Sequence, residues 1–320
     1  MSLINKIKVS VFDWLGSIYR TQSESLLKHK LTVFCYHDVT THPSEFSKNY
    51  KLNIPPEIFE NQIDLIKKNF NIINPDQLLS SSLPNNPALI TFDDGYASTF
   101  QTAIPILTKR SIPCLIFLNM GPIKGEISAQ GLTHFLCEKR DDFLLHLSSR
   151  VSISSKIPPF LYCSKKIVNS YIENTSESFD QKVGHYVGPL AKEIDLENMS
   201  KNHLVYFGNH LYHHDVPLHM DDHELVESYN KNKSCLDHLP NYRDFFAFPF
   251  GQPKISFTNR QIEVLKNNGA KKIFSSAGKL NHYLSKISYD RLSLSEHDDN
   301  ERKICAVLLK SHLRSLMSSN

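Results

Sequence analysis

The chain has 320 residues, of which 40% are hydrophobic, so it is long enough to bury a full core in one large domain or two. A formal net charge of +3, with 22% charged residues and no concentrated basic run, is too small to indicate a nucleic-acid partner. The six cysteines contain no C-x-x-C pair, which suits a reducing compartment. Since there is neither a run of about 18 apolar residues nor a signal-peptide core, we expect a cytoplasmic protein or one peripheral at the cytoplasmic membrane face.

The first predicted element is an amphipathic segment within residues 1–30. Apolar residues recur at helical spacing between positions 4 and 20, and Lys6, Lys8 and Arg20 flank them. Such a helix can lie on an anionic membrane surface, but a helix of this kind more often packs against its own domain. Both alternatives stay open, the first as a peripheral membrane contact through residues 4–20.

Strand-like and helix-like patterns alternate between residues 31 and 120. Strands are predicted where short runs are rich in β-branched and aromatic residues, and helices where apolar residues recur every three or four positions. In chain order the pattern predicts a strand at 31–37, a helix at 57–70, a strand at 88–92, a helix at 98–110 and a strand at 114–120. This alternation is typical of βα units with a parallel sheet, either open or closed into a barrel.

The strand at 88–92 stops at two adjacent aspartates, Asp93 and Asp94, which Gly95 follows. Two neighbouring carboxylates can share one site only if the strand ends there and the chain turns, and Gly95 allows the turn. In α/β folds, ligands and catalytic groups collect at the carboxyl ends of strands. An ordinary solvated turn is the alternative, so a cationic element elsewhere must decide between them.

The alternation stops between residues 121 and 200, where serine-rich polar patches separate short helix-like pieces. We interpret residues 121–200 as a largely helical insertion beside the mouth, because they follow the strand at 114–120. The alternation then resumes with a strand at 203–210, a helix at 222–238, a strand at 244–251, a helix at 258–269 and a strand at 271–276. The predicted organisation is one domain built from residues 31–120 and 201–300, with the insertion inside it and a C-terminal helix at 301–320.

The best candidate for the cationic element is the pair His210 and His214. At a spacing of four on a helical turn, two imidazoles project to the same side and can bind one metal ion. Two histidines with one carboxylate leave positions open for water, as in catalytic zinc sites. A divalent ion would also offset the repulsion between the aspartates, with one as ligand and the other ionised nearby. The chain has 16 histidines, and His213 and His219 crowd the same region.

Three segments together resemble the polysaccharide deacetylases of carbohydrate esterase family four, which include chitin and peptidoglycan deacetylases. T-F-D-D-G-Y at 91–96 matches the first motif of that family, G-N-H-L-Y-H-H at 208–214 its H-x-x-x-H motif, and F-A-F-P-F-G at 246–251 its third motif. The resemblance covers roughly residues 31–120 and 200–295. It implies an α/β fold, a distorted (β/α) barrel of about seven strands, in agreement with the alternation.

The resemblance also implies roles for individual residues. Asp93 corresponds to the catalytic base, and Asp94, His210 and His214 correspond to the ligands of a divalent metal, most simply Zn²⁺. The backbone N–H of Phe250 would stabilise the developing oxyanion, and Phe250 and Gly251 would approach the sugar.

Two positions depart from the family pattern or leave it open. Ala247 stands where members with a third-motif arginine carry it, so Arg291 could orient Asp93 instead, or could form a surface ion pair. The general acid is either His297, near the C-terminal end of the predicted barrel, or His37, at the end of the first strand.

The implied function is a metal-dependent hydrolase that removes N-acetyl groups from sugars of a polysaccharide or a lipid-linked saccharide, in surface-polysaccharide synthesis or modification. A non-catalytic sugar-binding protein on the same scaffold is the alternative, favoured only if a general acid is missing. A metal phosphohydrolase with His-Asp pairs is a second one. That class is all-helical, and an Asp-Asp-Gly segment at a strand end does not fit it.

Overall fold

The structure is a computed structural model that describes Leu27, residues 30–282 and residues 287–317. The amphipathic segment predicted at residues 4–20 lies outside the described residues. Among the described helices, none combines the length and the apolar content needed to cross a bilayer.

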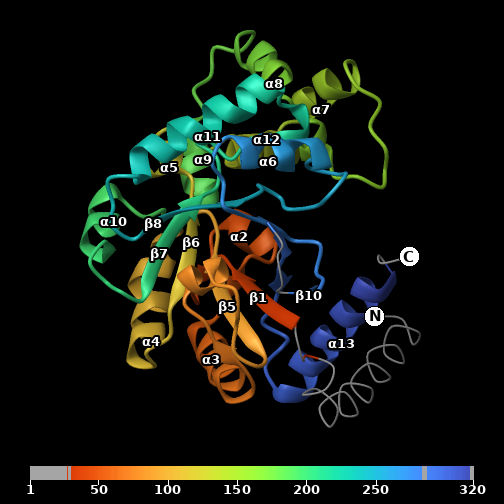
Figure 1. Ribbon diagram of the computed structural model, residues 1–320. Coiled ribbons are helices and arrows are strands. Elements are labelled where there is room, and N and C mark those ends of the chain that lie inside the picture. Colours follow the sequence, from red (N-terminus) through yellow and green to blue (C-terminus); the bar gives the residue numbers. More distant parts are fainter. Residues whose placement is uncertain (1–26, 28–29, 283–286, 318–320) are drawn as a thin grey trace, which may run out of the picture.

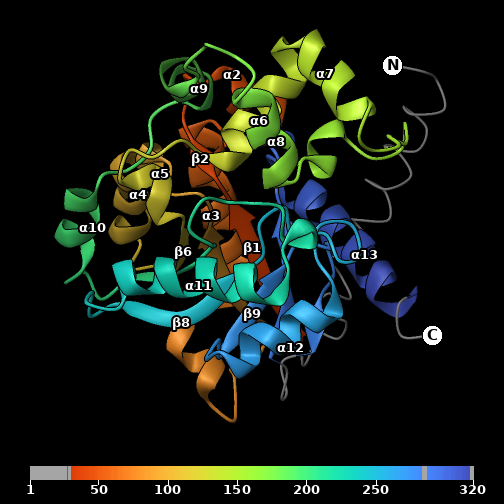
Figure 2. The same cartoon turned by 90° about the horizontal axis from the view of Figure 1, so that it is seen from above.

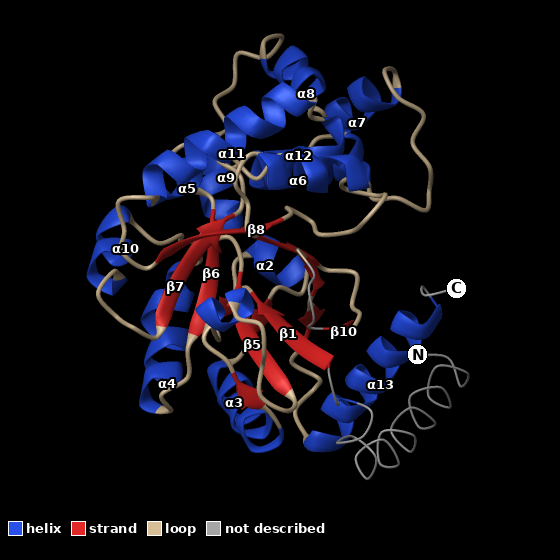
Figure 3. Cartoon of the chain, viewed as in Figure 1, coloured by secondary structure: helices blue, strands red, loops and turns tan. Residues whose placement is uncertain are grey.

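A parallel sheet curls into a nearly closed barrel at the centre of the molecule (Figures 1 and 3). Its strands lie side by side in the order β1 (Lys30–Tyr36), β5 (Pro87–Phe92), β6 (Cys114–Leu118), β7 (Val205–Asn209), β8 (Tyr242–Ala247) and β9 (Lys272–Ser275). The sequence prediction of an α/β barrel is confirmed for this part of the chain.

Two short strands complete the barrel. β11 (Ser288–Asp290) pairs with β9, and β12 (Leu292–Ser293) pairs with β1, both in parallel. Only Arg291 separates them, so together they act as one strand that joins the two edges. Counting them as one gives seven strands, as predicted. The sequence pattern did not reveal them, because each is too short to show a period. The remaining strands have only two residues each: β2 (Asp38–Val39), β3 (Asn53–Ile54), β4 (Asn71–Ile72) and β10 (Asn281–His282).

Helices surround the strands because each carries an apolar face (Figure 2). Around the barrel are α3 (Pro56–Asn69), α4 (Ile104–Lys109), α11 (Asp222–Leu236), α12 (Asn259–Asn267) and α13 (Glu301–Met317), with 3₁₀ turns η1 (Pro75–Leu79) and η4 (Pro217–His219). The short helix α2 (Glu45–Asn49) packs instead against helices of residues 120–199. The helix predicted at 98–110 is interrupted: it starts as a π-helix, η2 (Thr99–Ala103), before α4. The helix predicted at 258–269 is α12, and a capping box of Thr258 and Gln261 stands at its start.

Residues 120–199 are helical, with no strand among them. They form α5 (Met120–Ile123), α6 (Ala129–Lys139), α7 (Asp141–Ser148), η3 (Pro159–Tyr162), α8 (Lys165–Ile172), α9 (Asp180–Val187) and α10 (Glu193–Met199). The helices α6 to α9 have an apolar core of their own, to which α2 contributes Phe46. Below, residues 120–199 are called the helical segment.

The helical segment lies against the carboxyl ends of the strands. The N–H of Ala191 donates to the Gly95 carbonyl at 2.8 Å, and the N–H of Ala97 donates to the Pro189 carbonyl at 3.1 Å. The N–H of Ala129 donates to the His213 carbonyl at 3.1 Å. The segment is therefore hydrogen-bonded directly to both loops in which the sequence predicts site residues.

Candidate active site

Asp93 and Asp94 follow the last residue of β5 and are both almost fully buried. The N–H of Asp93 still donates to the Tyr36 carbonyl at 3.1 Å, so this residue continues the pairing with β1. The turn begins one residue earlier than the sequence suggested, because Asp94 has φ +67° and Gly95 has φ +75°. Aspartate tolerates this left-handed conformation better than most residues do. The turn lets both carboxylates face one site.

His210 and His214 lie in an irregular loop after β7, and the helical turn predicted for this pair is wrong. Leu211 and His214 each have φ +63°, and helical structure resumes only at Pro217. The chain could not form a regular turn through two such residues. The two imidazoles still converge, with ring centroids 4.8 Å apart.

Buried asparagines replace the missing backbone hydrogen bonds of this loop. The amide of Asn119 donates to the carbonyls of His210 and Leu211, the latter at 2.9 Å. The side-chain oxygen of Asn209 accepts from the Leu211 N–H at 3.0 Å and from the amide of Asn232 at 2.9 Å. Because buried polar groups must be satisfied, this network fixes the loop that carries both histidines. No local pattern in the sequence points to these asparagines.

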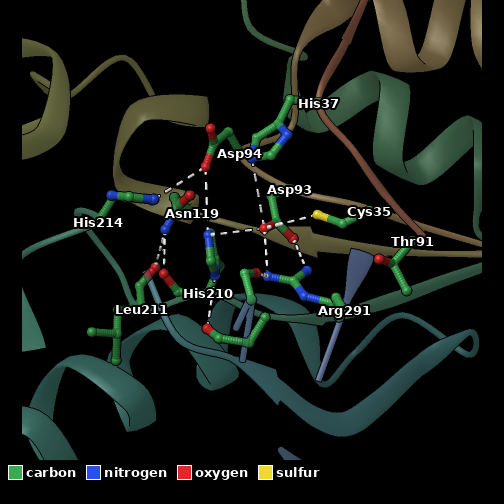
Figure 4. Close-up of polar contacts among 12 residues, drawn as sticks. Cys35, His37, Thr91, Asp93, Asp94, Asn119, His210, Leu211, His214 and Arg291 are labelled. Atoms are coloured by element: carbon green, nitrogen blue, oxygen red, sulfur yellow. Dashed lines mark hydrogen bonds and ion pairs between the residues drawn. The ribbon is translucent and has the colours of Figure 1, made fainter. Parts of the chain in front are cut away.

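Asp94, His210 and His214 form a buried group whose geometry suits a metal ion (Figure 4). The Asp94 Oδ1 lies 3.5 Å from His210 Nε2 and 3.2 Å from His214 Nε2. Neither oxygen of Asp94 has a hydrogen-bond partner among the described residues. A buried carboxylate without hydrogen bonds is costly unless a cation neutralises it, so these residues fit a divalent ion.

The protonation states agree with ligand roles. Burial tends to raise the pKa of Asp94, but the neighbouring His214 and His210 outweigh it and hold this pKa well below 3.8, so the carboxylate is ionised. The Nδ1 of His210 is 2.7 Å from the Ala247 carbonyl, which can only accept a hydrogen bond. The proton is therefore on Nδ1, which leaves Nε2 as a free lone pair toward Asp94.

Asp93 is held by Arg291, which is only 1% exposed. The guanidinium donates to both carboxylate oxygens, with NH1 2.6 Å from Oδ1 and NH2 2.8 Å from Oδ2 (Figure 4). Burial tends to raise the pKa of Asp93, yet the Arg291 guanidinium beside it lowers this pKa below 3.8. The Arg291 side chain also lies over the Phe117 ring, 5.4 Å from its centroid, inside the barrel. Of the two alternatives for Arg291, the contact with Asp93 is the one observed, and the surface ion pair is not.

The structure separates the two candidates for the general acid. The Nε2 of His37 lies 3.8 Å from Asp93 Oδ2, and its side chain is 21% exposed, so it can meet a substrate. His297 has an 83% exposed side chain whose charged neighbour is Glu296, and it makes no contact with Asp93. Burial lowers the pKa of His37 below 6.5, against the opposing effect of Asp94 and Asp93. Of the two candidates, His37 is the one that lies beside Asp93.

The comparisons with known proteins agree with this arrangement. A family model described as polysaccharide deacetylase matches residues 80–273, which is more than half of the chain and includes both aspartates and both histidines. The chain belongs to the polysaccharide deacetylase family. As a member, it is a hydrolase that acts on polysaccharides. No curated protein sequence matches it.

Solved structures of other deacetylases share the fold. IcaB from Ammonifex degensii is 19% identical and aligns over 87% of this chain and 97% of its own, with a TM-score of 0.56. The Streptococcus pyogenes deacetylase PplD in complex with acetate is 14% identical over 88% and 98%, with a TM-score of 0.58. A de-N-acetylase from Aggregatibacter actinomycetemcomitans is 16% identical over 87% and 100%, with a TM-score of 0.56. This barrel also rules out the all-helical phosphohydrolase class.

Phe250 and Gly251 of the deacetylase lie in a tight turn after β8. Their φ angles are +60° and +62°. A Cβ on Gly251 would meet Ser276 Oγ at 2.6 Å, so only glycine fits there. The N–H of Phe250 donates no hydrogen bond to the described residues, which leaves it free for a ligand. Phe246 and Phe248 are fully buried core residues.

The helical segment of the deacetylase fixes the Phe250 ring. His134 of α6 stacks on Phe160 with ring centroids 3.8 Å apart, and Phe250 lies parallel to His134 at 6.0 Å. On its other side, Phe250 meets the His214 ring edge-on at 4.9 Å. Burial lowers the pKa of His134 to about 3, so this imidazole is neutral. His134 was not predicted from the sequence, because a lone histidine in a helix gives no signal of its surroundings.

Other polar residues near the site have structural partners. Asp38 accepts hydrogen bonds from Ser47 at 2.7 Å and Ser98 at 2.6 Å, which ties β2 to α2 and to the start of η2. The Cys35 thiol is 3.6 Å from Asp93 Oδ2, and burial raises its pKa, so it is a weak donor to the base rather than a thiolate.

Proposed function

We propose that this deacetylase removes N-acetyl groups from sugars of a polysaccharide or a lipid-linked saccharide, using a divalent metal, most simply Zn²⁺. The observation that carries the proposal is the buried Asp94 carboxylate, which has no hydrogen-bond partner among the described residues and whose Oδ1 lies 3.5 Å from His210 Nε2 and 3.2 Å from His214 Nε2. Asp94, His210 and His214 would hold the ion. When bound, such an ion supplies a Lewis acid that lowers the pKa of water and polarises a carbonyl.

The residues around this group supply the proton transfers. Asp93 is ionised, and its Oδ2 is 3.8 Å from both His37 Nε2 and His210 Nε2, so this oxygen is placed to accept the proton of the attacking water. The free N–H of Phe250 stabilises the oxyanion. The Nε2 of His37 then gives a proton to the leaving nitrogen as the C–N bond breaks, which yields acetate and a free amine on the sugar.

The 3.8 Å between His37 and Asp93 is longer than a hydrogen bond, but such contacts often tighten only when substrate is bound. A small adjustment would let the proton accepted by Asp93 reach the imidazole. The alternative of a non-catalytic sugar-binding protein was favoured only if a general acid is missing. With His37 as the general acid, that condition is not met.

We also propose the domain division and the setting of the reaction. Residues 31–120 and 201–300 would be one deacetylase domain, with 121–200 as an insertion in it. The form F-A-F-P-F-G and the insertion support a role in surface-polysaccharide synthesis or modification by a protein that is cytoplasmic or peripheral at the membrane. These rest on the sequence patterns and on the hydrogen bonds between the helical segment and the barrel loops.

Substitutions of the two aspartates test the proposal, because Asp94 is proposed as a metal ligand and Asp93 as the catalytic base. We expect Asp94→Asn and His210→Ala to lose the metal at limiting Zn²⁺, since each removes one of three ligands. We expect Asp93→Asn to keep the metal while acetate release falls by roughly 10²–10⁴-fold, because it removes only the proton acceptor. The measurements are metal stoichiometry and acetate release from N-acetylhexosamine oligomers and lipid-linked sugars.

The matched control is His213→Ala. His213 is next to His214 in sequence, but its Nε2 bonds to Glu126 at 2.6 Å, outside the ligand group. This variant should keep the metal. If Asp94→Asn and His210→Ala bind as much metal as His213→Ala does, the proposed site is refuted.

A further inference from the structure

A largely apolar pocket of about 150 Å³ adjoins the candidate metal site. It lies between α6, α8 and the loop that carries His214. Leu132 and Val168 provide apolar walls from the two helices, and Val216 provides one from the loop. Two of its walls come from the helical segment, so the barrel alone would not form it.

The pocket shares two side chains with the proposed reaction site. His214, a candidate metal ligand, and Phe250, whose N–H is free, both line it. Their rings meet edge-on with centroids 4.9 Å apart, and Phe250 is held in place by His134 and Phe160. Of the candidate site residues, only His214 and Phe250 line the pocket, so a carbonyl bound between the metal site and the Phe250 N–H would have the pocket on the side of these two residues.

The pocket is larger than an acetyl methyl group needs. About 10–15 Å³ of this kind of volume suffices for one water, and an apolar cavity of about 150 Å³ can hold benzene, which has six carbons. A methyl group would leave most of the space unfilled, whereas a short hydrocarbon chain would fill it and bury its surface.

We propose that this pocket binds the hydrocarbon chain of the N-acyl group, so that the substrates include sugars with N-acyl chains of about four to six carbons. The inference rests on the proposed function, since it places the scissile carbonyl at the candidate metal site. An acyl chain is the occupant that fits best, because it is the apolar part of the substrate attached directly to that carbonyl. The sugar ring is polar, and it would lie outside the apolar walls.

The first test is hydrolysis of glucosamine derivatives that carry N-acetyl, N-butanoyl or N-hexanoyl groups. Each buried methylene is expected to raise kcat/KM about fourfold, so the butanoyl compound, which has two more methylenes, should exceed the acetyl compound by about fifteenfold. Val168→Phe and Ile127→Phe fill the pocket from α8 and from the loop before α6. Both should remove the preference for the longer chain, which is measured as the ratio of kcat/KM between the butanoyl and acetyl compounds.

The matched control adds the same ring on the surface. Ile194 of α10 is 54% exposed, so Ile194→Phe should keep the chain-length preference. If all chains are hydrolysed equally, or if the filling variants keep the preference, the proposal is overturned. A third outcome would be a higher kcat/KM for a lipid-linked N-acetyl sugar without any increase for longer N-acyl chains. That result would assign the pocket to the lipid, and it would also overturn the proposal.

The second test does not depend on activity. Calorimetry with the metal-free protein should show that N-hexanoylglucosamine binds at least tenfold more tightly than N-acetylglucosamine, and that Val168→Phe removes the difference. Equal binding of the two sugars would refute the pocket assignment. Absence of acetate release with this binding preference intact would instead refute the proposed function.

Discussion

The carboxyl edge of the barrel and the helical segment meet at one site, but they contribute opposite kinds of side chain. The barrel edge supplies ionisable groups in contact with one another: Asp93, Asp94, His210, His214 and Arg291, with His37 at 3.8 Å from Asp93. The helical segment supplies apolar walls and rings around Phe250. Even its one buried histidine near the site, His134, is neutral, because burial lowers its pKa to about 3.

The difference indicates a division of work. Charges that must act on one substrate atom are placed by strand ends and their short loops, which the hydrogen-bonded barrel holds rigidly. Shape and apolar volume can come from a segment with its own core that is added between two strands. On this view, changes at the barrel edge should alter the chemistry, and changes in the helical segment should alter stability or substrate size.

The largest effect in this comparison is expected at His37. His37→Gln removes the proposed proton donor, so kcat should fall by roughly 10²–10⁴-fold, with metal content unchanged because His37 is outside the ligand group. The matched control is His297→Gln, which changes the exposed alternative and should stay near the original activity. Steady-state kinetics with metal analysis would decide. A loss of activity at His297 with none at His37 would reverse the assignment.

A smaller effect is expected at Arg291. Arg291→Lys keeps the charge but cannot form both hydrogen bonds to Asp93, so activity should fall on the order of tenfold to a hundredfold. Because Arg291 lowers the pKa of Asp93, the weaker contact should raise that pKa and move the acidic limb of the pH–rate profile to higher pH.

Thermal unfolding separates this positioning role from a purely structural one. Arg291→Met leaves Asp93 buried without its partner and should unfold at a lower temperature than Arg291→Lys does. An unchanged pH profile in an active, folded Arg291→Lys variant would contradict the assignment.

The smallest effect at neutral pH is expected at His134, in the helical segment. Its pKa is about 3 when folded and about 6.5 when unfolded, so the unfolded state binds the proton first as the pH falls. The stability that this residue contributes is therefore complete above pH 6.5 and is lost progressively down to pH 3. Between pH 7 and 4.5 the loss should be about 2–3 kcal/mol.

His134→Phe removes this titration and keeps a ring in the stack. Urea unfolding of both proteins at pH 7 and at pH 4.5 measures the effect, and the variant should lose about 2–3 kcal/mol less than the original protein does. If both proteins lose the same free energy of unfolding between pH 7 and pH 4.5, His134 is not the residue that makes the protein less stable in acid. It would also weaken the contrast between a charged barrel edge and a neutral helical segment.

Much of the architecture was predictable from local patterns. Buried strands such as β5 and β6 are short apolar runs bounded by turn residues, and α12 begins with a capping box that the sequence displays directly. The closing strands β11 and β12 were not predictable, because segments of three and two residues are too short to show an alternation of apolar and polar side chains. The backbone of the His210–His214 loop was also missed, since Leu211 and His214 gain their left-handed conformation from asparagines distant in sequence.

The sequence by itself determined the βα alternation, the family resemblance and the identity of Asp93, Asp94, His210 and His214, because those signals are periodic or lie within a few residues. Only the tertiary structure showed that His37, and not His297, lies beside Asp93, and it gave Arg291 a partner. Asp93 and Arg291 are 198 positions apart, and their contact depends on how the barrel closes. No local pattern encodes that closure, since it is set by the pairing of strands from opposite ends of the chain.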